Sequence, residues 1–224
     1  MKIETTPQII AIETDYYIFN KAAGVSFHSE NGAGFVVQAE ALVGESLFAV
    51  HRLDKVTSGL IILARNKAAA AEFTELFASR RINKFYVALT DQKPKKKQGW
   101  VKGDMSKSRR GGFKLLKSHH NPAITRFYSV SLRANLRAFL LKPYSGKTHQ
   151  LRVAMKSIAA PILGDLQYSG SAHDRTYLHA YALSFLWRGT LKHYRVTDTQ
   201  GKQFSELFQH DSFQHWSAPW QLDW

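Results

Sequence analysis

The residue types best suited to catalysis occur together in segment 51–59, His-Arg-Leu-Asp-Lys-Val-Thr-Ser-Gly. It places one carboxylate, Asp54, between the cations Arg52 and Lys55 and ahead of two hydroxyl side chains. An acid in such surroundings can stay ionised and act as a nucleophile or as a base. A solvated hairpin with an Asx-type turn explains the same residues taken alone. The apolar stretches on both sides favour instead an acid held rigidly at the floor of a pocket.

A second segment, Gly146-Lys147-Thr148, precedes a helical pattern and suggests a phosphate-binding loop. A Walker loop requires a glycine five positions before its second glycine, and that position is Leu141. The nucleotide-hydrolase interpretation therefore fails. A short basic turn at the start of a helix can still hold one phosphate of RNA.

Several other chemistries are excluded or disfavoured by composition and spacing. The chain has no cysteine, which excludes disulfides, thiolate metal sites and a cysteine nucleophile. Its histidines at 149, 173, 179 and 193 do not have metal-ligand spacing, so we expect no metal site. No Gly-x-Ser-x-Gly occurs, which disfavours an elbow serine hydrolase.

Positive charge is concentrated in the middle third of the chain. The 224 residues include 31 Lys plus Arg and 17 Asp plus Glu, a net charge of +14. Residues 91–160 hold 17 basic and 2 acidic side chains, a net of +15, while 1–90 are balanced and 161–224 carry −1. This excess favours a polyanionic partner, nucleic acid or an anionic membrane surface, although a solvated basic loop is the simpler alternative. Glycines and a proline interrupt any helical period in the basic run, which disfavours an amphipathic membrane helix.

The N-terminus has neither the basic start nor the long apolar stretch of a signal peptide. No apolar run approaches the ~18–20 residues that a membrane span needs. We therefore expect a cytoplasmic protein with no membrane partner.

The elements that must position these residues mix strands and helices without strict alternation, which favours the α+β class. Helix 148–159 is expected to turn Leu151, Met155 and Ile158 to the core and His149, Arg152 and Lys156 to an opposite, basic face. The Trp-rich tail, 213–224, is expected to pack back onto the body, and 1–224 to form a single domain. Strands are expected at 8–13, 16–20, 47–50, 59–64, 85–89, 123–130, 136–141 and 180–187, and further helices at 35–43 and 67–79.

Five segments, in the right order, resemble the RluA-type pseudouridine synthases. They are His51-Arg52-Leu53-Asp54 with Thr57-Ser58-Gly59, Lys84-Phe85-Tyr86, Gly146-Lys147-Thr148-His149-Gln150-Leu151-Arg152, Pro161-Ile162-Leu163-Gly164-Asp165 with Tyr168 following, and the stretch Leu178–Phe185. The sequence departs from the family pattern at Ala22, Val56 and Ala154, none of them a position expected to do chemistry. The resemblance implies a mixed, largely antiparallel central sheet flanked by helices and loops. It also implies a chain without the small RNA-binding domain that many relatives carry in front.

The resemblance further implies isomerisation of uridine to pseudouridine in structured RNA, ribosomal or transfer RNA, with no cofactor. Asp54 is implied as the catalytic carboxylate, either a nucleophile at the anomeric carbon or a base toward the ribose. Arg152 is implied as its ion-pair partner, and Tyr86 as the ring that stacks on the extruded uracil. His51 is expected to order the turn.

The remaining implied residues bind RNA or line the uracil pocket. Arg52 is implied to fill the space left by the flipped base, and Leu183 and Phe185 to form the apolar wall of the pocket. Residues 91–120 are expected to be an RNA-contacting insertion, and the enzyme to act as a monomer. The cations expected to meet RNA are Lys55, Lys95, Lys96, Lys97, Arg109, Arg110, Lys147 and His149.

Two alternatives stay open at this point. One is a catalytically silent RNA-binding or RNA-folding protein on the same scaffold, because the charge pattern fits it equally well. The other is a glycosyl-cleaving enzyme that uses Asp54 and Asp165 as a carboxylate pair.

Overall fold

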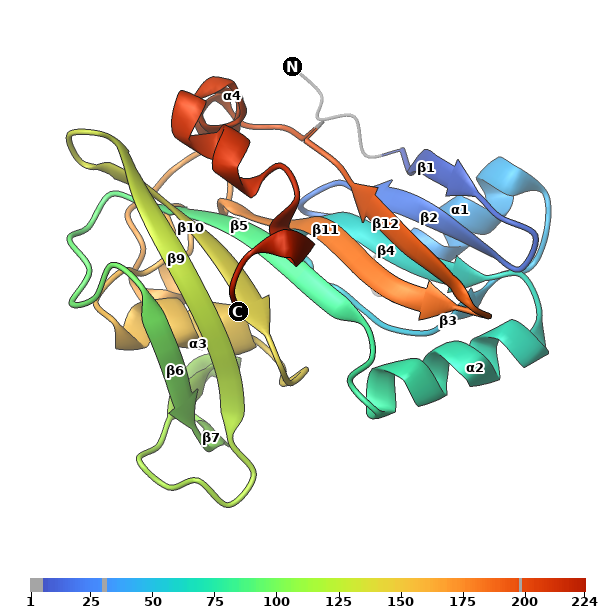
Figure 1. Cartoon of the computed structure of the whole chain (residues 1–224), viewed down its shortest axis with the longest axis horizontal. Helices are drawn as coiled ribbons and strands as arrows, with labels where there is room; N and C mark the ends of the chain where they lie inside the picture. The colour runs from blue at the N-terminus through green and yellow to red at the C-terminus, as the bar shows by residue number, and fades with distance from the viewer. Residues whose placement is uncertain (1–5, 30–31, 198) are drawn as a thin grey trace. The chain divides into compact units, whose positions relative to one another are not determined.

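The computed structural model describes residues 6–29, 32–197 and 199–224 (Figure 1). The chain divides into two compact units. The first unit comprises Met1–Ile82 and His179–Gln200, and the second comprises Asn83–Leu178 and Gly201–Trp224. The chain thus leaves the first unit, builds most of the second, and returns. Whether 1–224 acts as a single domain stays a prediction.

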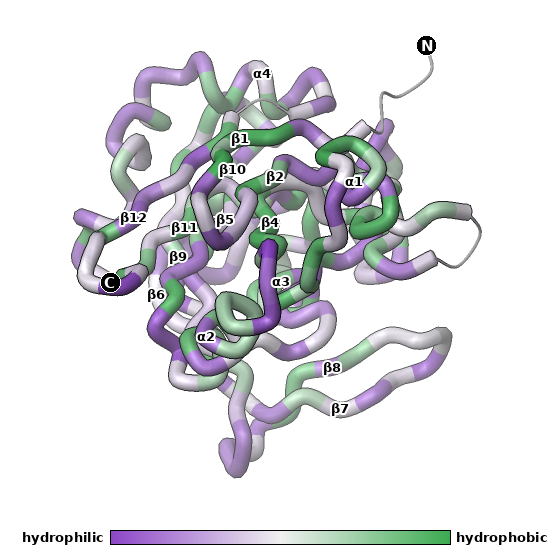
Figure 2. Tube along the Cα trace, turned by 90° about the vertical axis from the view of Figure 1, so that its right-hand side faces the viewer, coloured by the Kyte–Doolittle hydropathy of each residue, from purple (hydrophilic) through white to green (hydrophobic). Residues whose placement is uncertain are grey.

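The first unit is built on a sheet whose strands run in the order β1, β2, β4, β11, β12. All pairs are antiparallel except the parallel pair of β4 with β11. The short β3 pairs with the C-terminal end of β4. Strand β4 is buried along its whole length and is hydrophobic in colour in Figure 2. The strands are β1 (Gln8–Ile12), β2 (Tyr16–Lys21), β3 (Phe48–Ala49), β4 (Ser58–Ala64), β11 (Leu178–Trp187) and β12 (Thr190–Arg195).

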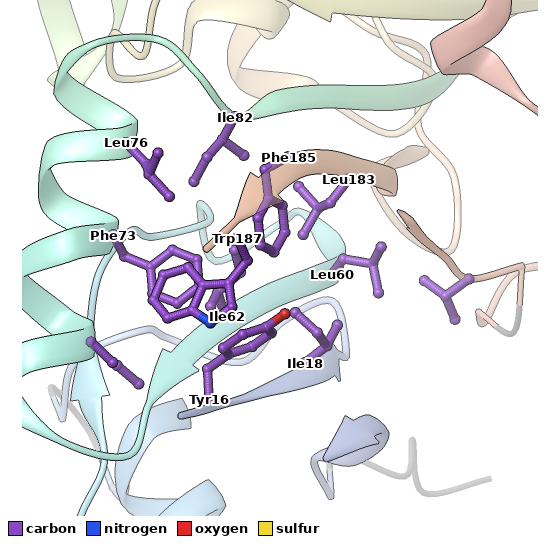
Figure 3. Close-up of a cluster of buried hydrophobic side chains, with 13 residues drawn as sticks. Tyr16, Ile18, Leu60, Ile62, Phe73, Leu76, Ile82, Leu183, Phe185 and Trp187 are labelled. Carbon is purple, nitrogen blue, oxygen red and sulfur yellow. The ribbon is translucent and has the colours of Figure 1, made fainter. Parts of the chain in front are cut away.

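Helix α2 (Lys67–Ala78) packs on this sheet and closes the core of the first unit (Figure 3). Its N-cap residue is Asn66, whose side chain accepts a hydrogen bond from the Ala69 N–H. On the buried face of the helix, the Phe73 ring stacks on Trp187 with ring centroids 4.3 Å apart. Helix α1 (Phe35–Val43) ends at Gly44 in the left-handed conformation. Both helices and the first two strands were expected from the sequence, and the structure confirms them.

The second unit contains an antiparallel sheet in the order β5, β10, β9, β6. Its strands are β5 (Asn83–Thr90), β6 (Gly99–Gly103), β9 (Ala123–Arg133) and β10 (Leu136–Pro143). A separate hairpin pairs β7 (Met105–Lys107) with β8 (Phe113–Leu115), with the one-turn helix η1 (Arg109–Gly111) between them. The basic segment 91–120 therefore contains three short strands, which the sequence analysis did not expect. Its glycines break a helix but are compatible with short strands.

Helix α3 (Gln150–Ser157) packs against β9 and β10. It is shorter than the predicted 148–159, and Arg152 lies buried in it instead of on an exposed basic face, so that expectation is wrong. The short helix η2 (Leu166–Tyr168) packs against α3 on the side of Arg152.

The C-terminal region consists of α4 (Lys202–Gln209), η3 (Asp211–Trp216) and η4 (Pro219–Gln221). The last residue, Trp224, packs its ring on Phe85 and Tyr128, with centroids 5.4 and 5.1 Å apart. The prediction that the tail packs back onto the body is therefore confirmed within the second unit.

Candidate active site

Asp54 lies in the turn that connects β3 to β4 in the first unit. Its carbonyl oxygen accepts a hydrogen bond from the Thr57 N–H at 3.0 Å, which closes the turn. Leu53 is buried beneath it, Asp54 is half-buried, and Arg52 and Lys55 are exposed. The turn thus anchors itself through its apolar residue and presents its charged residues at or near the surface.

The two ends of this turn are fixed by neighbouring backbone and side chains. The Lys55 carbonyl accepts a hydrogen bond from the Gly24 N–H at 2.7 Å. The ammonium of Lys21, a fully buried residue, lies 3.5 Å from the same carbonyl and donates to the carbonyl oxygens of Ala22 and Val25 at 3.0 and 2.9 Å. Sequence analysis did not single out Lys21 as a functional residue. A lysine buried among carbonyls holds the loop after β2 against the Asp54 turn.

His51 fixes the other end of the turn. Its Nε2 accepts a hydrogen bond from the Ile62 N–H at 2.9 Å, and its ring packs on Phe77 at a centroid distance of 4.6 Å. The expectation that His51 orders the turn is confirmed. The backbone that carries Asp54 is consequently tethered both before and after this residue.

The residues after the turn lock β4 onto β11. Ser58 lies opposite His179 in the parallel pair, and its hydroxyl is 2.8 Å from His179 Nδ1. His179 Nε2 is 3.0 Å from the Val196 carbonyl, so in the neutral imidazole Nε2 donates to that carbonyl and Nδ1 accepts from Ser58. Gly59 has a φ of +113°, and an added Cβ would lie 2.3 Å from the Ala180 carbonyl oxygen. The contact of β4 with β11 therefore explains why Ser58 and Gly59 occupy these positions of the motif.

In the second unit, Arg152 makes a buried, two-pronged ion pair with Asp165. Its Nε is 2.7 Å from Asp165 Oδ2 and its Nη2 is 2.8 Å from Oδ1, and Nη2 also donates to Gln167 at 2.8 Å. Both charged side chains are at most 5% exposed. Asp165 is thus engaged through both oxygens, which disfavours the alternative in which it is half of a sugar-cleaving carboxylate pair. The pairing of Arg152 with Asp54 stays a prediction.

Tyr168 connects the start of α3 with the β7–β8 hairpin. Its hydroxyl accepts a hydrogen bond from the Phe113 N–H at 2.9 Å and lies 2.7 Å from His149 Nδ1. Arg152 places its guanidinium 4.7 Å from the centre of the Tyr168 ring. His149, predicted to meet phosphate, is therefore part of an internal network. Sequence analysis named Tyr168 only as a neighbour of the fourth motif.

The Gly146-Lys147-Thr148 turn is clamped by the residue that starts α3. The buried Gln150 accepts hydrogen bonds from the Ser145 hydroxyl and the Lys147 N–H and donates to the Ile124 carbonyl and Thr125 hydroxyl. Lys147 itself is half-buried. The helix begins after this turn, at Gln150, so the tripeptide precedes α3.

Tyr86 lies on β5, opposite Leu141 of β10, and is half-buried. Lys84 is two residues away and so shares its face of the sheet. Burial lowers the pKa of the Lys84 ammonium below its ordinary value. A tyrosine and a lysine therefore lie together on one face of the second-unit sheet.

Leu183 and Phe185 do not occupy the position expected of pocket residues. Both lie on β11 in the hydrophobic core of the first unit, with exposed fractions of 2% and 1% (Figure 3). They contact the cluster around Phe73 and Tyr16 and offer almost no surface to a ligand. The prediction that they form the uracil wall is therefore corrected: they are core residues.

Most cations predicted to bind RNA are on the surface. The side chains of Lys95, Lys96, Lys97 and Arg109 are exposed, while that of Arg110 lies outside the described part of the structure. We call Lys95, Lys96 and Lys97 the lysine turn. It is tethered by the Lys95 N–H, which donates to the Ile158 carbonyl at 2.8 Å. These cations are therefore presented from a fixed backbone.

Two negative findings apply to the residues that the structure describes. No helix among them is both long and apolar enough to cross a membrane. They also contain no group of three or more histidine or acidic side chains arranged to hold a metal ion.

The fold and these sites were compared with known proteins. A model of the RNA pseudouridylate synthase family matches residues 15–157, which include Asp54, Tyr86 and Arg152. The chain belongs to this family. Members of the family are isomerases that convert uridine to pseudouridine in RNA, and the resemblance noted in the sequence is thereby confirmed.

Curated relatives support the same assignment. The chain is 54% identical over 183 residues to an "Uncharacterized RNA pseudouridine synthase" of Haemophilus influenzae, a match that covers 80% of this chain and 81% of that protein. It is 32% identical over 174 residues to "Ribosomal large subunit pseudouridine synthase C" of Rickettsia bellii, covering 73% of this chain and 57% of that protein.

Among solved structures, human RNA pseudouridylate synthase domain containing 1 is similar with a TM-score of 0.74 and 24% identity, covering 88% of this chain and 86% of that one. Human RNA pseudouridylate synthase domain containing 4 is similar with the same TM-score and identity, covering 89% of this chain and 90% of that one. These likenesses concern the fold, which is α+β as expected.

Proposed function

We propose that this enzyme isomerises a uridine of ribosomal RNA with Asp54 as the catalytic carboxylate and without a cofactor. The observation that carries the proposal is the Asp54 turn, whose backbone is tethered through Lys55 on one side and His51 on the other. The turn lies within the residues that match the family model. The name of the Rickettsia relative, which refers to the large ribosomal subunit, supports ribosomal over transfer RNA.

The reaction requires no net oxidation or reduction. The bond between N1 of uracil and C1′ of the ribose breaks, the freed uracil rotates, and a bond forms between C5 and C1′. The proton on C5 is lost and N1 gains one, so the product is an isomer of the substrate. A carboxylate serves this sequence either as a nucleophile at C1′ or as a base toward the ribose.

Tyr86 and Arg152 complete the proposed machinery. The Tyr86 ring offers a surface for stacking on the uracil that has left its helix, and its hydroxyl a group near the C5 proton. Arg152 is always protonated and favours the ionised form of a nearby carboxylate. Its bond to Asp165 supports this role by fixing the orientation of the guanidinium.

The first prediction concerns Asp54. We expect Asp54→Asn to reduce pseudouridine formation to background while the affinity for RNA stays within a few-fold, because the amide keeps the size of the side chain but cannot act as nucleophile or base. The measurement is tritium release from RNA labelled at C5 of uridine, with Asp211→Asn, an exposed acid of the second unit, as the matched control.

The same assay separates the alternatives. Tritium release by the unmodified chain supports the synthase, release of free uracil supports a glycosyl-cleaving enzyme, and neither supports a silent RNA-binding protein. Full activity of Asp54→Asn would refute the role of Asp54. Mapping pseudouridines in total RNA from cells that lack the gene then distinguishes ribosomal from transfer RNA.

A further inference from the structure

One face of the second-unit sheet carries a group of aromatic and cationic side chains that the proposed chemistry does not use. The strand register places Trp100 of β6 opposite Arg126 of β9, and Arg126 opposite Lys142 of β10. Lys142 lies with its ammonium 5.5 Å from the ring centre of Phe85 on β5. Phe85 and Tyr86 are consecutive on one strand, so this row lies on the face of the sheet opposite Tyr86.

The side chains of this face contact one another. Lys102 and Arg126 lie 4.6 and 5.2 Å from the ring centre of Trp100, and Lys142 lies 5.1 Å from that of Tyr144. The Trp100 and Tyr144 rings are 5.2 Å apart. We call these five residues, Trp100, Lys102, Arg126, Lys142 and Tyr144, the back-face patch.

The back-face patch places like charges side by side. Arg126 and Lys142 are direct cross-strand neighbours, an arrangement that destabilises a sheet unless an anion offsets it. Burial, and then the charge of Arg126, lower the pKa of Lys142 below its ordinary value. None of the ion pairs among the described residues involves Lys102, Arg126 or Lys142. The arrangement therefore suits an external anion with more than one charge.

An aromatic surface is available beside these cations. Trp100 is 39% exposed, the only tryptophan among the large hydrophobic side chains that the structure places at the surface. Trp224 of the C-terminal segment contacts the neighbouring Phe85 and Tyr128, and its ring centre lies 5.5 Å from the Lys142 ammonium, whereas Trp100 contacts the ring of Tyr144. A planar ring and several cations without an acidic partner are the two components with which single-stranded nucleic acid is bound: bases stack and phosphates meet charge.

We propose that the back-face patch binds a single-stranded stretch of RNA, with a base stacked on Trp100 and the adjoining phosphates held by Lys102, Arg126 and Lys142. The site is distinct from Asp54 and Tyr86 and does not depend on their chemistry. It favours substrates in which unpaired nucleotides accompany the target uridine. An acidic peptide would satisfy the cations but gains nothing from the exposed indole, so RNA is the partner that uses the whole patch.

The test uses the full chain and a fluorescent decamer of adenosine, which contains no uridine and so offers no target to the proposed active site. We expect Trp100→Ala to weaken its binding about tenfold and Trp100→Phe to restore most of the loss, because stacking needs an aromatic face. Lys102→Gln should weaken binding and lower the slope of log affinity against log salt by about 1. Lys202→Gln, which removes an exposed cation on α4, should change neither quantity.

Three results would overturn the proposal. One is unchanged decamer binding by Trp100→Ala in a variant whose circular dichroism matches that of the parent. Another is an equal loss in Lys202→Gln, which would indicate unspecific attraction to net charge. A glutamate decapeptide that displaces the RNA from the parent and from Trp100→Ala equally well would also identify a purely electrostatic surface. Asp54→Asn should bind the decamer like the parent, so failure of the proposed catalysis and failure of this site are separable.

Discussion

At the scale of single residues, the Arg152–Asp165 pair illustrates how a motif can serve position as much as chemistry. The two side chains are buried and joined by two hydrogen bonds, with Gln167 as a third partner. A buried pair of this kind contributes little net stability over an apolar pair, but losing one partner leaves a charge without compensation. The two hydrogen bonds hold the guanidinium in one orientation.

We therefore predict that Asp165→Asn lowers the free energy of unfolding by about 3 kcal/mol, since it leaves the Arg152 charge buried without its counter-ion. Glu206→Gln is the matched control, because it breaks an exposed pair with Arg133 and should cost less than about 1 kcal/mol. Urea denaturation of both variants measures the difference. Equal losses in the two variants would show that the buried pair has no special role.

The burial of Arg152 could not be predicted from its own helix. Helical periodicity set it apart from Leu151 and Met155, and an arginine on such a face normally meets solvent. What covers it is η2, whose position depends on the Pro161–Asp165 segment and on Gly164 at a φ of +80°. Likewise, Leu183 and Phe185 could be identified as apolar strand residues, but the sequence does not reveal which face of β11 contacts α2.

At the scale of elements, the contact of β4 with β11 depends on one glycine. We predict that Gly59→Ala costs more than about 3 kcal/mol of stability, because the new Cβ would lie 2.3 Å from the Ala180 carbonyl on a backbone with φ of +113°. Gly24→Ala is the control: its φ is +85° but no atom lies within 4 Å, so only backbone strain of about 1 kcal/mol is added. Thermal unfolding compares them, and similar losses would exclude the steric explanation.

The junction of β2 with β12 depends on a chain of hydroxyl groups. Tyr16 is fully buried, its hydroxyl is 3.0 Å from that of Tyr194, and Tyr194 donates to Glu13 at 2.6 Å. Burial raises the pKa of Tyr16 to about 12. The neutral phenol is therefore favoured in the folded state, and its contribution is fully present below the unfolded pKa near 10.

We expect this contribution to be lost as the pH rises from about 10 to about 12, because the unfolded chain releases the proton first. Tyr16→Phe should cost about 1 kcal/mol at pH 8 through the lost hydrogen bond, and should reduce the fall in stability between pH 10 and 12. Denaturant midpoints of both proteins across this range test the prediction. An equally steep fall in Tyr16→Phe would assign the alkaline loss to other groups.

Elements with a strong hydrophobic period were predictable, and those held by pairing alone were not. Helix α2 follows from its apolar face and its Asn66 cap, and the structure confirms it. Strands β6, β7 and β8 were missed because Gly99, Gly103 and lysines dilute any alternation, and pairing with β9 or within the hairpin stabilises them. Fully buried strands such as β4 were visible as continuous apolar runs.

At the scale of the whole molecule, the charge is distributed in a way that fits an RNA-modifying enzyme. Residues 91–160 carry a net charge of +15, against +14 for the whole chain, and the exposed lysines before β6 belong to this stretch. The turn around Asp54 lies outside it. The proposed catalytic carboxylate therefore lies outside the basic stretch, while its proposed partner Arg152 lies inside it.

Neutralising Lys95, Lys96 and Lys97 to glutamine should weaken RNA binding and flatten its dependence on salt by about 2 in the log–log slope, because fewer counterions are released. Equilibrium binding at several salt concentrations measures this, with Lys67→Gln on α2 as a control that removes an exposed cation elsewhere. An unchanged slope in the triple variant would place the lysine turn outside the RNA interface.

The hydrogen bond from the Phe113 N–H to Tyr168 has one more consequence. The amide of β8 is protected by a phenol that also contacts His149, at the start of α3. Lifting the β7–β8 hairpin from the body must break this bond and expose the amide to solvent. The exchange rate of that single amide hydrogen therefore reports how often the hairpin opens, and a slower exchange in the presence of RNA would register the hairpin closing onto its substrate.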